Sequence, residues 1–232
     1  MAHSIQRQSM VSTIVIYIGF AFGALNLWLL QTLIGKDYYG LTRVVNDTSF
    51  MLAYFATFGS QALIAKFLPF YKHYLPKEKN DLSFIALVIV AIGTIVTSLL
   101  LLLLKPHIIL LFGRINPFFI HYYWMIIPYT FLFIAFIFFE PFAWHAGKAV
   151  YANLLKETVI RLITTLLVVL LLLKLIDAVF FVQAFAFIYL IPVLIGYYLL
   201  IKWKAIRINF SVSSVTKRLR GRMFGFSSFL FL

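Results

Sequence analysis

Six long apolar stretches separated by short polar gaps run along the chain. A helix that crosses a hydrocarbon core of about 30 Å needs about 20 apolar residues, and each of these stretches is long enough. The pattern therefore predicts membrane-spanning helices over residues 10–34, 42–66, 82–104, 118–139, 149–173 and 178–201. A further apolar stretch, residues 223–232, is too short to cross and is predicted to be the start of a seventh helix.

Composition agrees with this pattern and narrows the function. The chain is 63% hydrophobic and only 12% charged, about half the charged fraction of soluble domains. The absence of cysteine excludes disulfides, thiol catalysis and cysteine zinc sites. The histidines lack a metal-binding spacing, and the chain has no glycine-rich phosphate loop and no nucleophile elbow. We therefore expect a polytopic all-α membrane protein that is not an enzyme, with no catalytic residue, metal or cofactor beyond a coupling H⁺ or Na⁺.

The basic residues indicate the orientation of the chain. Fifteen of the 20 Lys and Arg residues fall at the N-terminus and in the alternate gaps around residues 66–81, 148–161 and 202–222. Such residues are retained on the cytoplasmic side. We therefore predict a cytoplasmic N-terminus and a basic cytoplasmic linker over residues 202–222 that contacts anionic lipid. The net charge of +13 does not indicate nucleic-acid binding, because the cations lie between apolar spans.

Several polar residues fall inside the outer halves of the predicted spans. At 1.5 Å per residue, Asn26, Asp47 and Gln183 lie at a similar depth, roughly 8–12 Å below the outer surface. Arg43 and Asp47 are four residues apart, so they share a helix face and can pair. Two interpretations are open: the pair anchors its helix at the interface, or Asn26, Arg43, Asp47 and Gln183 form a polar or ion-coupling site.

A second charged cluster is predicted at the cytoplasmic end. Lys66 closes the second span, and Lys156, Glu157 and Arg161 lie in the opening turns of the fifth. Arginine and lysine recognise phosphate by paired hydrogen bonds or as a point charge. These residues, with Glu140 at the end of the fourth span, therefore suggest a cationic mouth for an anionic cargo, although positive-inside retention alone would also place the cations there.

Small residues and prolines indicate how the helices pack. Gly19 and Gly23 form a GxxxG pattern, which permits close approach of another helix. Pro128 and Pro192 fall inside predicted spans, where proline kinks or breaks a helix.

The first predicted hairpin resembles that of a known transporter family. The runs Leu33-Ile34-Gly35, Tyr38-Tyr39-Gly40-Leu41, Phe58-Gly59-Ser60 and Ile64-Ala65-Lys66-Phe67 are similar to the first hairpin of the Wzx-like oligosaccharide flippases. These flippases belong, with multidrug and lipid II exporters, to one MATE-like superfamily. The start of the fifth span, with Lys156, Glu157 and Arg161, is similar to the polar start of the family's fifth helix. The sharp part of the resemblance covers about 35 residues.

The resemblance implies a six-helix N-terminal lobe of a MATE-like transporter over residues 1–201, followed by the linker and the first turns of helix 7. It also implies an inner-membrane flippase for an undecaprenyl-pyrophosphate-linked oligosaccharide, a precursor of O-antigen or another surface polysaccharide. Since the family has two such lobes, we expect a missing C-terminal or partner lobe. The cationic mouth, Lys66, Lys156 and Arg161, would receive the pyrophosphate. The alternatives are a drug or small-solute exporter of the same superfamily and a non-transporting scaffold of a glycan-assembly complex.

Overall fold

The computed structural model describes residues 2–114, 116–206 and 208–229. Helices make up 85% of the structure, and the described residues include no strand. Four helical segments are long and apolar enough to cross a membrane, and a bent helix pair makes a fifth. The chain is an all-α polytopic membrane protein, as its hydropathy predicts.

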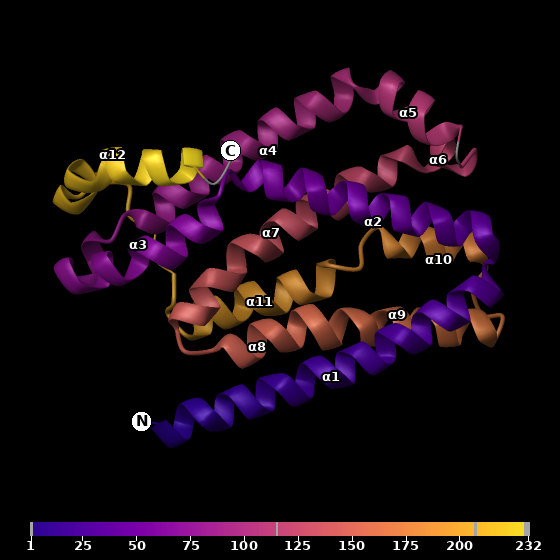
Figure 1. Cartoon of the computed structure of the whole chain (residues 1–232), viewed down its shortest axis with the longest axis horizontal. Helices are drawn as coiled ribbons and strands as arrows, with labels where there is room; N and C mark the ends of the chain where they lie inside the picture. Colours follow the sequence, from indigo (N-terminus) through magenta and orange to yellow (C-terminus); the bar gives the residue numbers. More distant parts are fainter. Residues whose placement is uncertain (1, 115, 207, 230–232) are drawn as a thin grey trace.

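The first hairpin is tighter than the sequence suggests. Helix α1 (Ala2–Leu33) and helix α2 (Gly35–Thr57) are separated by Ile34 alone, and the two helices diverge from this turn (Figure 1). The gap between the first two predicted spans, residues 35–41, is not a loop, because these residues already form the first turns of α2. Gly35 permits so short a reversal because its φ of 76° lies in the left-handed region that glycine enters readily.

The second predicted span is bent near its end. Phe58 and Gly59 both have positive φ, 44° and 68°, which ends α2 and starts α3 (Ser60–Tyr74) in a new direction. The two helices meet at an angle of 42°. Residues 42–66 therefore do not form one straight helix.

Both predicted proline sites coincide with interruptions. Proline cannot donate to the carbonyl four residues before it and its ring clashes with that carbonyl. Pro128 lies in the first turn of α7 and Pro192 in the first turn of α11, each directly after a break. The two segmented spans are α6 (Phe118–Tyr122), η2 (Tyr123–Met125) and α7 (Ile126–His145), and then α10 (Ala178–Phe185) and α11 (Leu190–Lys202).

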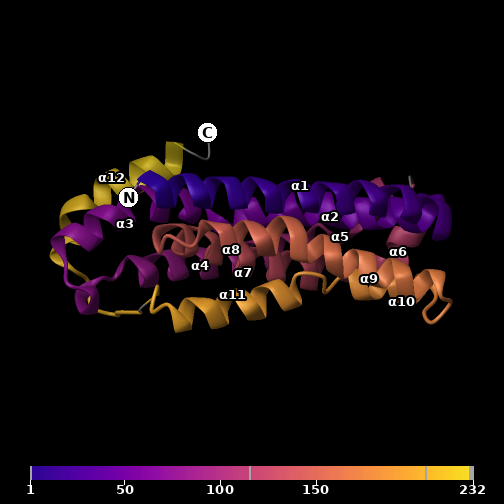
Figure 2. The ribbon, with the colours of Figure 1, turned by 90° about the horizontal axis from the view of Figure 1, so that it is seen from below.

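The fifth predicted span contains a π-helical turn. Helix α8 (Ala149–Asn153), the π turn η3 (Leu154–Val159) and helix α9 (Ile160–Leu172) follow one another without a loop. Helix α1 lies along all three in both views (Figures 1 and 2). A Cβ added at Gly19 would overlap the carbonyl oxygen of Glu157, so the predicted close approach at the GxxxG pattern is confirmed.

Helix α7 forms the centre of the bundle. It packs against α2, α3, α4 and α11, and its aromatic side chains make up much of the buried core. The largest of these buried residues are Tyr129, Phe133, Phe136, Phe139 and Phe142. The outer surface of α4 (Leu82–Leu103), by contrast, exposes large aliphatic side chains, as a lipid-facing helix does. Helix α5 (Lys105–Gly113) follows α4 and leads toward α6.

The predicted linker and seventh helix are not separate elements. Helix α12 (Ser214–Phe229) begins inside the basic segment and continues through Met223, while residues 230–232 lie outside the described part of the chain. A carboxylate attaches α12 to the bundle. Oδ2 of Asp81, a residue only 1% exposed, accepts hydrogen bonds from the Ser213 amide (2.9 Å) and the Thr216 hydroxyl (2.7 Å). The Tyr71 hydroxyl also lies 2.7 Å from that of Thr216.

Replacing Asp81 with alanine is expected to release α12. The substitution leaves the Ser213 amide and the Thr216 hydroxyl without their carboxylate acceptor, which costs about 1–3 kcal/mol. Met223, 5% exposed on α12, can be replaced by the only cysteine in the chain. Thiol labelling at this position should accelerate about tenfold in Asp81→Ala. Asp177→Ala, which removes the cap of α10 instead, should leave the labelling rate unchanged; equal rates in all three proteins would contradict this role for Asp81.

Candidate functional site

A polar cavity of about 530 Å³ lies between α1, α2, the η3–α9 segment and the break before α11. Its charged and amide-bearing lining residues are Asn26, Arg43, Asn46, Lys156, Glu157 and Arg161. Its aromatic lining residues are Phe20, Tyr39, Phe50, Tyr129, Phe185 and Tyr189. The cavity therefore combines hydrogen-bonding groups and cations with ring faces, inside the helical bundle.

The position of Gly23 along α1 indicates how deep in the membrane this cavity lies. Gly23 lies against Arg161, whose Cδ and Nε would be 3.2 Å from an added Cβ. Gly23 is roughly ten residues, or about 15 Å, from the end of α1 at Leu33, and so lies near the middle of a 30 Å core. Arg161 is thus beside the midpoint of the α1 span, whereas the sequence analysis assigned it to the cytoplasmic mouth.

The Arg161 guanidinium has partners on two sides. Its Nη2 donates to Oε2 of Glu157, four residues earlier on the same helix face, at 2.9 Å. Its guanidinium also lies 4.6 Å from the ring centroid of Phe20, a cation–π distance. Nη1 is buried and has no hydrogen-bond partner among the described residues. This nitrogen lies against α1, where a Cβ added at Gly19 would be 3.4 Å from it.

Asn26 connects α1 to the backbone beside that arginine. Its amide nitrogen donates to the carbonyl oxygen of Arg161 at 2.9 Å, and its amide oxygen accepts from the Thr165 hydroxyl at 2.9 Å. The sequence predicted Asn26 in the outer half of the membrane and Arg161 at the cytoplasmic mouth. Instead, they are neighbours in one site, because α1 and the η3–α9 segment cross at the GxxxG glycines.

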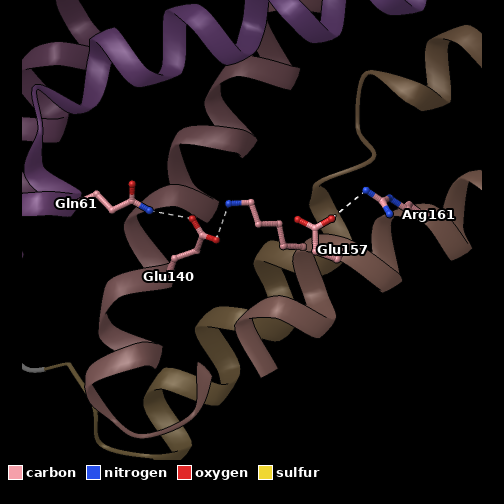
Figure 3. A network of polar contacts seen from close by, with 5 residues as sticks. Gln61, Glu140, Glu157 and Arg161 are labelled. Atoms are coloured by element: carbon pink, nitrogen blue, oxygen red, sulfur yellow. Dashed lines mark hydrogen bonds and ion pairs between the residues drawn. The ribbon is translucent and has the colours of Figure 1, made fainter. Parts of the chain in front are cut away.

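Lys156 pairs with the buried carboxylate of Glu140 (Figure 3). Nζ of Lys156 lies 2.9 Å from Oε1 of Glu140, and the amide of Gln61 donates to Oε2 at 2.9 Å. The Glu140 side chain is 1% exposed and that of Lys156 is 31% exposed. Gln61, Glu140 and Lys156 come from α3, α7 and η3, so one polar chain joins three elements inside the bundle.

The predicted Arg43–Asp47 pair is not formed. Nε of Arg43 instead donates to the Tyr39 hydroxyl at 3.2 Å, while Asp47 accepts from the side chain of Asn46 at 2.9 Å. Tyr39 precedes Arg43 by four residues, so it occupies the same helix face and competes for the guanidinium. Neither ion pair found among the described residues includes Arg43.

The cavity brings together five of the eight predicted site residues: Asn26, Arg43, Lys156, Glu157 and Arg161. Lys66 is not in its lining, and its Nζ lies 3.7 Å from the ring centroid of Phe226 on α12. Asp47 and Gln183 are exposed and are also absent from the lining. Two other lining residues, Asn46 and Tyr129, were not predicted as site residues; they hydrogen-bond to each other across α2 and α7. The polarity of Asn46 inside a span was a usable signal, but nothing distinguishes Tyr129 from the other aromatic residues of its span.

The fold and the site together define a polytopic helical membrane protein with a charged cavity within the bundle. No protein-family model, no curated protein and no solved structure matches the chain. The assignment of a function therefore depends on the cavity and on the hairpin resemblance.

Proposed function

We propose that the chain is a lobe of an exporter that moves a lipid-linked oligosaccharide across the inner membrane, and that the polar cavity binds the anionic part of this cargo. The observation that carries the proposal is an uncompensated cation in the lining. Lys156 pairs with Glu140 and Arg161 with Glu157, whereas Arg43 is in neither ion pair found among the described residues. Charge within a membrane-spanning segment is costly unless it has a function, and an uncompensated cation favours a phosphate-bearing cargo over a cationic drug.

The aromatic lining supports the same cargo class. Sugar rings present flat faces of C–H groups that can pack on aromatic rings, while their hydroxyls need amide and hydroxyl partners of the kind that Asn26 and Asn46 supply. Pyrophosphate would bind the guanidinium groups through charge-assisted hydrogen bonds. Coupling to H⁺ or Na⁺ and a partner lobe are proposed only because the first hairpin resembles that of the flippase family.

Arg43 offers the cleanest test, because its removal breaks no ion pair. Arg43→Gln should weaken binding of undecaprenyl pyrophosphate to the purified chain about tenfold, the effect of losing one charge-assisted hydrogen bond. Lys66→Gln makes the same charge change outside the cavity and should bind as tightly as the wild-type chain. Equal losses in both variants would contradict the cavity as the cargo site.

The same assay separates the alternatives. A drug exporter should bind a lipophilic cation and ignore undecaprenyl pyrophosphate. A scaffold should bind neither ligand while retaining its protein partners. Either result would overturn the proposed cargo.

A further inference from the structure

A second cavity, of about 840 Å³, lies outside the polar site and shares no lining residue with it. It is formed by α4, the bend between α2 and α3, and helix α12. Its apolar wall includes Phe58, Leu63, Ile85, Ile89, Ile92 and Met223. This volume falls within the range of about 300–1,000 Å³ that is typical of ligand-binding pockets.

The wall on α4 has the shape of a trough. Ile85, Ile89 and Ile92 are spaced four and three residues apart, so they line one face of the helix. They extend over roughly 10 Å along the axis. Because α4 is one of the membrane-spanning helices, this trough lies parallel to the acyl chains of the surrounding lipid.

The lining of the cavity includes a cation. Arg220 of α12 belongs to the lining, is exposed, and is not in either ion pair found among the described residues. The hydroxyl of Ser227, another lining residue, is buried and has no hydrogen-bond partner in the described part of the chain. An apolar cavity whose lining includes one arginine is complementary to an amphiphile with one anionic group.

The position of Arg220 is fixed by the rest of the fold. Thr216 lies one turn earlier on the same face of α12, also lines the cavity, and donates to the buried Asp81 at 2.7 Å. Met223 is 5% exposed against the bundle. The arginine therefore projects from a docked helix and not from a mobile tail, which lowers the entropic cost of binding.

We propose that this cavity binds an anionic glycerophospholipid, with one acyl chain in the α4 trough and the phosphate at Arg220. A lipid fits better than a protein helix, because the lining combines one cation with a largely apolar surface, as a lipid combines one anionic headgroup with apolar chains. The cytoplasmic leaflet supplies such lipids. This site does not depend on the cargo proposed for the polar cavity.

Native mass spectrometry of the detergent-purified chain with phosphatidylglycerol or phosphatidylcholine tests the site. The wild-type chain should retain phosphatidylglycerol about tenfold better than phosphatidylcholine, and Arg220→Gln should abolish this preference. Arg218→Gln is the matched control: it makes the same charge change on α12, but Arg218 is exposed and outside the lining. Its preference should equal that of the wild-type chain.

A second variant tests the trough itself. Ile89→Trp fills the trough and should reduce retention of both lipids while leaving undecaprenyl pyrophosphate binding at the polar cavity unchanged. The site is disproved if Arg218→Gln and Arg220→Gln lose the preference equally, since the attraction would then be a diffuse effect of the basic helix. It is also disproved if the wild-type chain retains both lipids equally well. A third contrary result would be a dimer that persists when lipid is added but is lost in Ile89→Trp, because a second copy of the chain would then occupy the cavity.

Discussion

Lys156→Met should destabilise the bundle by about 3 kcal/mol. Removing one partner of a buried ion pair costs about 3–5 kcal/mol, because the remaining charge is left without compensation. Here that charge is Glu140, whose side chain is 1% exposed and keeps only the amide of Gln61 as a partner. The lower end of the range applies because Lys156 is itself 31% exposed. Unfolding in mixed detergent micelles, followed by circular dichroism, measures the loss.

Two further variants make this result specific. The double variant Lys156→Met/Glu140→Gln removes both charges, so it should regain most of the lost stability. Lys202→Met removes an exposed lysine at the end of α11 and should change the free energy of unfolding by less than about 0.5 kcal/mol. A double variant as unstable as Lys156→Met would show that the methionine, and not the unpaired carboxylate, disrupts the fold.

Gly19→Ala should cost about 1–3 kcal/mol and separate α1 from the η3 turn. The added methyl group would overlap the carbonyl oxygen of Glu157, and because both groups are fixed to helical backbone, the helices must move apart. A cysteine at Ala152, a buried residue of α8, reports this movement through its labelling rate, which should rise in the Gly19→Ala background.

Gly221→Ala is the matched control. A Cβ at Gly221 meets nothing within 4 Å, and alanine is the better helix former. This variant should therefore leave the stability and the labelling rate at Ala152→Cys unchanged or slightly improve the stability. If Gly19→Ala behaves in the same way, α1 and η3 do not depend on the glycine contact.

The sequence predicted the class of fold well because twenty-residue apolar stretches have few alternatives in a bilayer. It did not predict the interruptions at Phe58-Gly59 and in η3. Those depend on local backbone geometry, and hydropathy averaged over a whole span cannot detect them. The loop expected between the first two spans is absent for a related reason. Gly35, with its positive φ, allows the chain to reverse within one residue, so the polar residues after it need not form a loop.

The site shows a different limit. By helical rise, Arg161 lies about 18 Å from the start of α8 at Ala149, well past the interface. The charge pattern nevertheless predicted it at the mouth, because the positive-inside rule describes the bias of whole gaps and says nothing about single residues. Glu157, four residues earlier, neutralises this arginine within the bundle. Which helix lies opposite the pair depends on tertiary packing, and no pattern in one segment contains that information.

The packing of α1 also determines the order in which the protein can mature. Helix α1 leaves the ribosome long before residues 149–172, yet its glycine face and Asn26 pack against that later segment. Until the later segment arrives, the Asn26 side chain lacks the Arg161 carbonyl and the Thr165 hydroxyl as partners, and the glycine face must be covered by lipid or by an insertion factor. The polar cavity therefore cannot exist during early insertion and closes only as α8, η3 and α9 enter the membrane.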